Sequence, residues 1–109
     1  MYIAEAHPTD EWQVGSNETE GVLLEQHTSF EERKAAAVAM EESLGLKVPQ
    51  LIDGMDDAAS EAFAAWPERI FIVGTDGNMA YCGGPGPFEF YPDEARTALT
   101  ELVDSATDN

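Results

Sequence analysis

Hydrophobic and polar positions follow one another in blocks that predict short strands and helices. The apolar run at residues 2–6 predicts a strand, which should stop at Pro8 because proline cannot continue a paired ladder. Ser29 and Glu32 form a capping box before an alanine-rich run, so a helix is expected from there to about Leu44. Its partial apolar face is expected to comprise Phe30, Ala37, Val38, Met40 and Leu44.

The second half of the chain predicts a short strand, a helix, a hairpin and a final helix. Residues 48–53 fit a short strand and residues 56–65 a helix. The run at 70–73 is the most apolar and β-branched, which predicts a central strand. The segment Thr-Asp-Gly-Asn then predicts a tight turn into an antiparallel partner at 79–82. Pro92 occupies the preferred first position of a terminal helix.

The apolar run at 22–24 fits a short strand or an extended arm. The predicted order is then strand, extended arm, helix, strand, helix, hairpin and helix, which indicates an α/β protein with a mixed sheet. It matches the later part of a thioredoxin-like mixed sheet flanked by helices, without the first strand and helix of that fold. We expect a single domain over residues 1–109. The uncovered sheet edge and apolar face would favour a homodimer.

The charge balance limits the classes of partner. The chain has 22 acidic residues against 5 basic ones, a formal net charge of -17, which disfavours nucleic acid and anionic membrane surfaces. The acidic residues are spread along the whole chain, so we favour adaptation to a high-salt, halophilic cytoplasm over an acidic protein from an ordinary cell. The first interpretation predicts that stability rises with salt concentration.

Cysteine usage and hydropathy add two further expectations. Cys82 is the single cysteine, which leaves no internal disulfide and no zinc-binding cluster. No apolar run approaches the roughly 20 residues of a membrane span, and no signal peptide opens the chain. We therefore expect a soluble, cytoplasmic protein with no bound metal or cofactor.

Glu5 and His7 are the first candidates for chemistry. They are two residues apart, so a strand would place both on one face. A neighbouring carboxylate raises the pKa of a histidine and fixes its tautomer, which suits an acid/base pair. The same spacing also fits a surface glutamate beside a loop histidine, and spacing alone leaves both interpretations open.

Four stretches together resemble the iodothyronine deiodinase family of the thioredoxin-like superfamily. The matching segments are YIAEAHPTDEW at 2–12, QHTSFEERKAAA at 26–37, VPQLIDGMDDAASEAF at 48–63 and AWPERIFIVGTDGNMAYCGGPGPF at 65–88. The resemblance implies reductive removal of iodine from an iodinated aromatic substrate. It also implies a cysteine or selenocysteine nucleophile and an external thiol reductant, because a soft nucleophile suits attack on a halogen.

The same resemblance implies a role for individual residues. Glu5 and His7 occupy positions that relay protons and help to activate the nucleophile. His27 and Arg69 match the pair that holds the two ends of an iodothyronine, its phenolic hydroxyl and its carboxylate. An arginine suits a carboxylate because its planar group offers two parallel donors. Trp12 is a further substrate-binding candidate.

Each of these residues also has a simpler structural interpretation. His27 precedes a capping box and fits a surface loop residue, and Trp12 fits a loop anchor against the core. Arg69 could be satisfied by Glu68 or by a backbone carbonyl, a contact that contributes roughly 0–1 kcal/mol at a surface. Pro67 is a candidate for the cis-proline of thioredoxin-like sites, although trans is the commoner state of any X–Pro bond.

The nucleophile is where the sequence departs from the family. In the family it lies before the strand that here begins at Tyr2, and only Met1 precedes that residue. Cys82 lies in the hairpin, where we interpret it as a mildly buried strand cysteine. We therefore expect an enzyme that is catalytically incomplete as written. Three explanations stay open: a fragment of a longer protein, a selenocysteine codon misread as a stop, or a short protein that has lost catalysis.

Two alternative functions accompany the deiodinase-like one. Residues 48–63 also resemble the strand and helix that follow the site of a peroxiredoxin-like peroxidase. A non-catalytic module could instead use His27 and Arg69 to bind an aromatic, amino acid-like ligand. The physiological substrate stays open under all three hypotheses.

Overall fold

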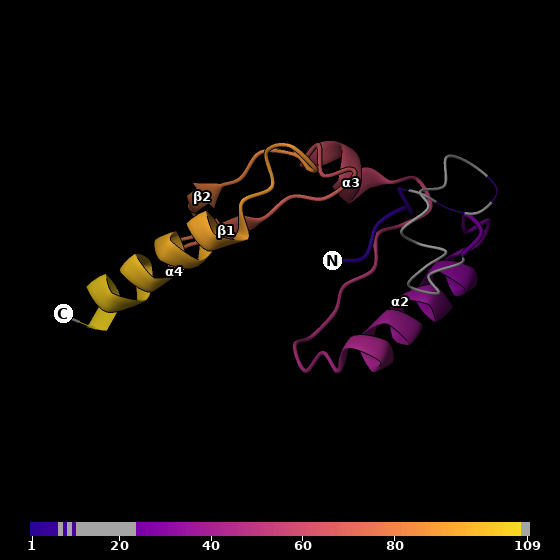
Figure 1. The fold of residues 1–109 in the computed structure, drawn as a ribbon, viewed down its shortest axis with the longest axis horizontal. Helices are drawn as coiled ribbons and strands as arrows, with labels where there is room; N and C mark the ends of the chain where they lie inside the picture. The colour runs from indigo at the N-terminus through magenta and orange to yellow at the C-terminus, as the bar shows by residue number, and fades with distance from the viewer. Residues whose placement is uncertain (7, 9, 11–23, 108–109) are drawn as a thin grey trace. The chain divides into compact units, whose positions relative to one another are not determined.

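The computed structural model describes residues 1–6, 8, 10 and 24–107. The chain divides into two compact units, Met1–Trp66 and Pro67–Asn109. The first contains helices α2 (Phe30–Leu44) and α3 (Ala58–Ala62), and the second contains strands β1 (Phe71–Val73) and β2 (Met79–Cys82) with helix α4 (Pro92–Thr107) (Figure 1). Together their elements make a mixed α/β protein, as expected.

Helix α2 has the predicted limits. The Ser29 hydroxyl oxygen accepts a hydrogen bond from the backbone N–H of Glu32, at 3.2 Å. The Glu32 carboxylate in turn accepts from the N–H and hydroxyl of Thr28, at 2.7 and 2.8 Å. At the other end Gly45 adopts a left-handed conformation with φ of 63°, which costs little without a Cβ atom. The predicted N-terminal cap is confirmed, and the helix ends at Leu44 as expected.

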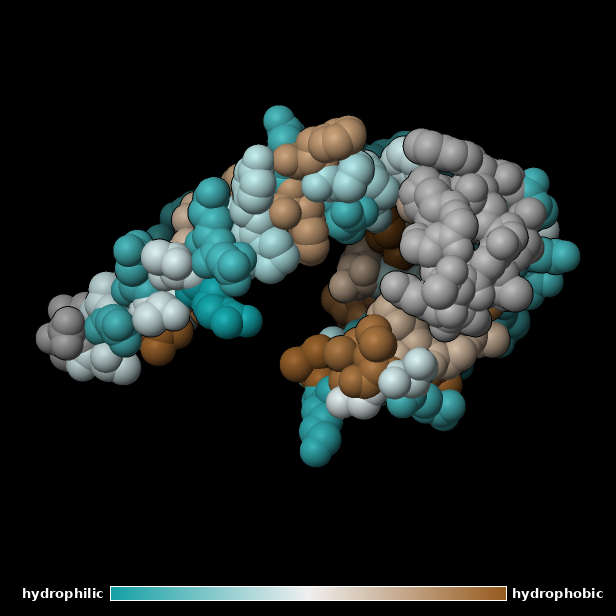
Figure 2. Space-filling view, in the orientation of Figure 1, coloured by the Kyte–Doolittle hydropathy of each residue, from teal (hydrophilic) through white to brown (hydrophobic). Residues whose placement is uncertain are grey.

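The apolar face of α2 was predicted only in part. Ala36 and Ala37 form a small core with Tyr2, and Met40 and Ile52 pack against it. The predicted contributions of three larger residues are wrong, because the structure leaves them exposed: Phe30, Val38 and Leu44. Figure 2 shows apolar residues gathered over the C-terminal end of α2 and the segment after it, where the exposed side chains are Leu44, Leu46 and Val48.

The two strands predicted in the first unit reduce to one parallel bridge between Tyr2 and Ile52. Tyr2 donates its N–H to the Leu51 carbonyl and accepts from the Asp53 N–H, both at 2.8 Å. The ladder does not continue to Glu5, because the Gln26 side chain takes both backbone groups of that residue. Strands at 2–6 and 48–53 are therefore corrected to this single bridge.

Helix α3 is shorter than the predicted 56–65. Asp57 has φ of 55° and Ala64 has φ of 47°, and residues in that left-handed region cannot belong to a right-handed helix. The Asp53 carboxylate accepts hydrogen bonds from the backbone N–H groups of Gly54, Ala59 and Ser60, at 2.9–3.0 Å. A buried carboxylate from outside the helix thus satisfies two N–H groups of its first turn.

The second unit contains the predicted hairpin. β1 and β2 pair antiparallel, with Phe71 opposite Cys82 and an irregularity after Ile72. The turn is closed by Asp76, whose carboxylate accepts from the Asn78 N–H at 3.0 Å. Gly77 has φ of 83°, a conformation that favours glycine. The described sheet has these two strands, so the expected central position of 70–73 is not observed.

Helix α4 begins at Pro92 as predicted and contacts both strands of the hairpin (Figure 1). Ala95 of this helix is buried, whereas Leu99 and Val103 are exposed. No helix in the described part of the chain is long and apolar enough to cross a membrane.

Candidate functional site

The structure brings two of the five predicted site residues together. The His27 Nε2 atom lies 3.5 Å from Oε1 of Glu5 in the first unit. Arg69 belongs to the second unit. His7 and Trp12 lie outside the described residues, so their predicted roles stay predictions. The described site is therefore built around Glu5 and His27.

The side chain of Gln26 binds the backbone of Glu5 and fixes its position. Its side-chain oxygen accepts from the Glu5 N–H at 3.1 Å, and its side-chain nitrogen donates to the Glu5 carbonyl at 3.0 Å. The Gln26 N–H donates in turn to the Asp10 carboxylate at 2.8 Å. Because Gln26 is the residue before His27, the same contact sets the spacing between the carboxylate and the imidazole.

Tyr2 completes one side of this pair. Its hydroxyl donates a hydrogen bond to Oε1 of Glu5, and its ring lies 5.7 Å from the His27 ring, tilted by 42°. The sequence pattern does not indicate this role, because a continuous strand would place Tyr2 and Glu5 on opposite faces. The contact becomes possible because the strand pairing stops after Tyr2.

Arg33 on α2 fixes the imidazole of His27 from the other side. Its Nε–H donates to Nδ1 of His27 at 3.2 Å, and the residue is 2% exposed. Since Nδ1 accepts this bond, the proton of the neutral ring lies on Nε2. The Nε2 atom is buried and has no hydrogen-bond partner among the described residues. The ring therefore presents a donor that makes no hydrogen bond to a described residue, although Oε1 of Glu5 lies 3.5 Å away.

The remaining donors of Arg33 hold the segment before α3. Nη1 donates to the Gly54 carbonyl at 2.7 Å and lies 3.0 Å from the Asp57 carboxylate. In the sequence Arg33 appears as part of an exposed charged run. Its spacing to Ala36, Ala37 and Met40, which are three, four and seven residues further on, is the signal that places it on the buried face.

The environment shifts the pKa values of both Glu5 and His27. Burial lowers the pKa of His27, and the Arg33 charge lowers it further, while Glu32 acts in the opposite direction. Burial raises the pKa of Glu5, with Arg33 opposing that rise. The site therefore places a neutral imidazole beside a carboxyl group that keeps its proton to a higher pH than an ordinary glutamate, an arrangement that suits proton exchange with a bound molecule.

The remaining chemical candidates belong to the second unit. Arg69 donates from Nε to the Gly83 carbonyl at 2.8 Å, and its guanidinium lies 4.7 Å from the centre of the Phe71 ring. The predicted alternative, a backbone carbonyl as partner of Arg69, is thus confirmed. Cys82 is exposed, so its interpretation as mildly buried is wrong.

Two further features concern cofactors and prolines. The described residues contain no group of three His, Cys, Asp or Glu side chains that could hold a metal ion. The cis peptide bond among them precedes Pro87, so Pro67 is not the cis-proline that the sequence suggested.

Comparison with known proteins identifies the family. Residues 1–103 match the model of the family described as iodothyronine deiodinase. Type I iodothyronine deiodinase of Xenopus laevis is 37% identical over 100 residues, which cover 91% of this chain and 37% of that protein. Type II iodothyronine deiodinase of Rattus norvegicus is 37% identical over 102 residues, covering 91% of this chain and 38% of that protein.

A third relative, thyroxine 5-deiodinase of Bos taurus, is 33% identical over 99 residues, covering 91% of this chain and 31% of that protein. The chain thus spans between 31% and 38% of the length of these three relatives. The matching segments contain both Glu5 and His27. This chain belongs to the iodothyronine deiodinase family.

Proposed function

We propose that this chain supplies the proton-handling and substrate-binding part of a thiol-dependent, deiodinase-like oxidoreductase with a thioredoxin-like fold. The observation that carries the proposal is the buried Nε2 of His27, which has no described hydrogen-bond partner and lies 3.5 Å from a carboxyl group with a raised pKa. Family membership supports an iodinated aromatic as the substrate class.

The proposed reaction replaces a carbon–iodine bond by a carbon–hydrogen bond. A thiolate or selenolate attacks iodine and forms a chalcogen–iodine bond, while the electron pair of the broken bond stays on the ring carbon. That carbon takes a proton. Two equivalents of thiol then release iodide, restore the nucleophile and form a disulfide. The carbon therefore needs a proton donor near the substrate.

Glu5 suits the donor role in this scheme. Burial raises its pKa, so more of it is protonated near neutral pH than of an ordinary glutamate. The resemblance gives His7 a part in the same proton relay. His27, with its proton on Nε2, suits the phenolic oxygen of the substrate, and Arg69 is proposed for the carboxylate at the other end.

The resemblance assigns the nucleophile to a segment upstream of Tyr2. We therefore propose to test activity in a chain extended by a cysteine-containing segment at that end. Iodide release from an iodothyronine should require dithiothreitol and should fall at least about 100-fold in Glu5→Gln, the range of general-acid contributions. Equal activity in Glu5→Gln would contradict the role of Glu5. Faster turnover of hydrogen peroxide than of the iodothyronine would favour a peroxiredoxin-like peroxidase.

A binding module for aromatic, amino acid-like ligands is the second candidate. The same Nε2 atom of His27, which has no described hydrogen-bond partner, favours this function. Binding a ligand through this donor requires no nucleophile, whereas deiodination does. Titration of the present chain with 3,5-diiodotyrosine tests it directly. Binding that weakens in His27→Gln supports a ligand at this site, and unchanged binding in that variant would exclude His27 from it.

A further inference from the structure

We propose that Arg33 is a positioning residue that holds His27 in one ring orientation and as the neutral tautomer with its proton on Nε2. The assignment deepens the proposed function, because it determines what His27 can offer to a ligand. Arg33 touches the imidazole on the side away from Glu5, so it would act on a substrate only through His27. Neither the sequence motifs nor the family resemblance indicated this residue.

The direction of one hydrogen bond carries the assignment. The guanidinium of Arg33 has donors and no acceptor, and it stays protonated at all ordinary pH values. Its Nε lies 3.2 Å from Nδ1 of His27, so that ring nitrogen must accept. A proton on Nδ1 would set two N–H groups against each other. In the imidazolium it would also place a second positive charge beside that of Arg33. The neighbouring arginine therefore excludes both the other neutral tautomer and the imidazolium.

Burial makes this constraint effective. Arg33 is 2% exposed and His27 is 7% exposed, so water offers Nδ1 no competing partner. The electrostatic interaction is also stronger in such an environment than at the surface. Other ionisable groups lie on the elements around the ring. They are Tyr2 and Glu5 on the first segment, Glu32 on α2, and Asp53 and Asp57 before α3.

The guanidinium is itself held in place. Nη1 donates to the Gly54 carbonyl at 2.7 Å, approaches the Asp53 carbonyl at 3.4 Å and pairs with the Asp57 carboxylate at 3.0 Å. Asp53 is fixed in turn by three backbone N–H donors, of which Ser60 gives the shortest bond. Turning the guanidinium away from His27 would break these contacts. Arg33 thus forms a rigid support for the imidazole.

The consequence concerns the kind of ligand atom that the site selects. With its proton on Nε2, His27 offers a neutral donor next to Glu5 and suits an oxygen acceptor such as a phenolic hydroxyl. The opposite tautomer would present a bare nitrogen there and would favour a ligand that donates. Arg33 would in this way set the site for an acceptor atom.

Nitrogen-15 NMR of the histidine side chains in the present chain tests the assignment without a substrate. The two histidines are His7 and His27, and a His27→Gln sample identifies their signals. We expect His27 to show a protonated Nε2, a bare Nδ1 and a titration below that of an ordinary histidine. In Arg33→Met the two neutral tautomers should mix and the titration should move to higher pH.

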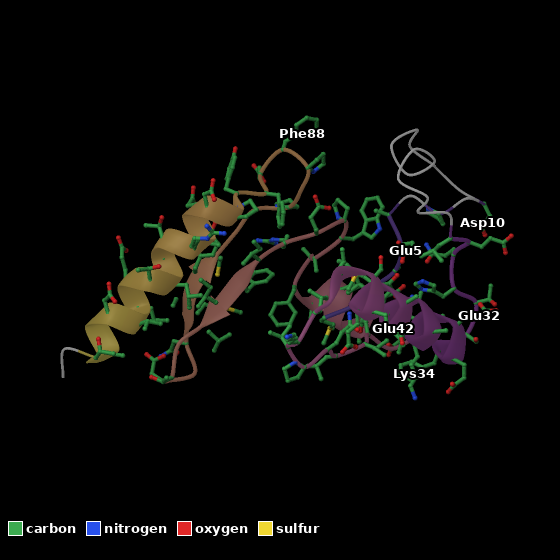
Figure 3. All side chains as sticks on the ribbon, turned by 60° about the horizontal axis from the view of Figure 1, so that its bottom comes forward. Glu5, Asp10, Glu32, Lys34, Glu42 and Phe88 are labelled. Carbon is green, nitrogen blue, oxygen red and sulfur yellow. The ribbon has the colours of Figure 1, made fainter. Side chains whose placement is uncertain are left out.

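Two further variants separate the hydrogen bond from the charge and from the fold. Arg33→Lys keeps the charge but lacks the Nε–H, so the two neutral tautomers of His27 should mix as they do in Arg33→Met. Lys34→Met removes the same charge from the next residue, whose side chain is exposed and points away from the helix in Figure 3. It should leave the His27 signals unchanged. If Arg33→Met does not fold, Asp57→Asn loosens the guanidinium from a half-buried position and should produce a smaller shift in the same direction.

A wild-type His27 with a protonated Nδ1 would overturn the assignment, as would unchanged signals in both Arg33 variants. Titration with 3,5-diiodotyrosine supplies the second measurement. Arg33→Met should weaken binding about tenfold, the effect of losing one well-placed hydrogen bond. If the wild-type chain binds no iodinated phenol while its tautomer depends on Arg33, the proposed function fails and the positioning role stands.

Discussion

Different kinds of contact stabilise the two units of this protein, each considered by itself. In the first, the side chains of Gln26 and Arg33 bind backbone groups 21 residues away in sequence, and the Asp53 carboxylate binds backbone N–H groups up to seven residues away. Strand pairing among the described residues of this unit is limited to one bridge. In the second, a backbone ladder joins β1 to β2, and α4 contacts that hairpin. The first arrangement concentrates charge and hydrogen-bonding capacity around one imidazole, and the second provides a framework made of regular elements.

This difference has a consequence for mutations. A backbone ladder depends little on any single side chain, because its hydrogen bonds belong to the main chain. A network of buried side chains loses several bonds when one member is removed, and each unpaired buried group adds its desolvation cost. We therefore expect the largest single-residue effects in the first unit.

Arg33→Met is expected to have the largest effect. It removes the donor to His27 and the donors to the Gly54 and Asp53 carbonyls, and it leaves these groups without their partner. The free energy of unfolding should fall by about 3–4 kcal/mol, as measured by urea denaturation followed by circular dichroism. Lys34→Met is the matched control and should stay within about 0.5 kcal/mol of wild type. Equal effects of the two variants would contradict a supporting role for the buried arginine.

Asp53→Asn should have the next largest effect. Burial raises the pKa of Asp53, but bonds from Ser60, Ala59 and Gly54 together outweigh that effect, so the pKa is lowered overall. An amide can accept on only one of its two side-chain atoms, so α3 should lose part of its capping, worth about 1–2 kcal/mol.

The same substitution in the other unit provides the comparison. Asp76 closes the hairpin turn and accepts from the Asn78 N–H, but it lies in an exposed position. Asp76→Asn should therefore change the urea midpoint much less than Asp53→Asn does. A larger effect at Asp76 would reverse the proposed contrast between the two units.

The contrast also explains what the sequence could predict. The limits of α2, the hairpin and the start of α4 depend on neighbouring residues such as Ser29, Gly45 and Pro92, whose local preferences are strong. The prediction of a strand at 2–6 was wrong because the side chain of Gln26, 21 residues further on, binds the backbone N–H and carbonyl of Glu5 in place of a neighbouring strand. Such a long-range contact between a side chain and the backbone has no periodic signal in a sequence.

The candidate site follows the same rule. The motif indicated Glu5 and His27, but it did not indicate the residues that hold them. Arg33 lies in a charged run and Tyr2 in an apolar one, and neither pattern indicates a contact with His27 or Glu5. These contacts depend on where the chain folds back. Partners that become neighbours only through the tertiary fold are the part of a site that a single sequence does not predict.

The dependence of stability on pH should distinguish the two titratable residues of the site. The pKa of His27 is lowered by folding, so its contribution is present above the ordinary histidine value of about 6.5 and is lost as the pH falls. The pKa of Glu5 is raised by folding, so its contribution is present below the ordinary glutamate value of about 4.3 and is lost as the pH rises through the folded value.

The two effects therefore have slopes of opposite sign. The contribution of His27 falls as the pH drops below about 6.5, and the contribution of Glu5 falls as the pH rises above about 4.3. Relative to wild type, His27→Gln should remove a contribution that rises with pH, and Glu5→Gln should remove one that falls with pH. Urea midpoints at half-unit intervals of pH measure both slopes. Parallel curves for the two variants would contradict the opposite pKa shifts at the site.

The smallest expected effect comes from a pair of tyrosines that have similar bonds in different surroundings. Tyr2 is 8% exposed and donates to Glu5, whereas the hydroxyl of Tyr81 lies 3.3 Å from Glu94 at an exposed position. Tyr2→Phe should lower the free energy of unfolding by about 1 kcal/mol and raise the pKa of Glu5 further, since the carboxylate loses a donor. Tyr81→Phe should leave the urea midpoint unchanged, because water replaces the lost partner. If the two substitutions have equal effects, burial is not what makes the hydrogen bonds of the first unit important, and the contrast between the units would rest on backbone pairing alone.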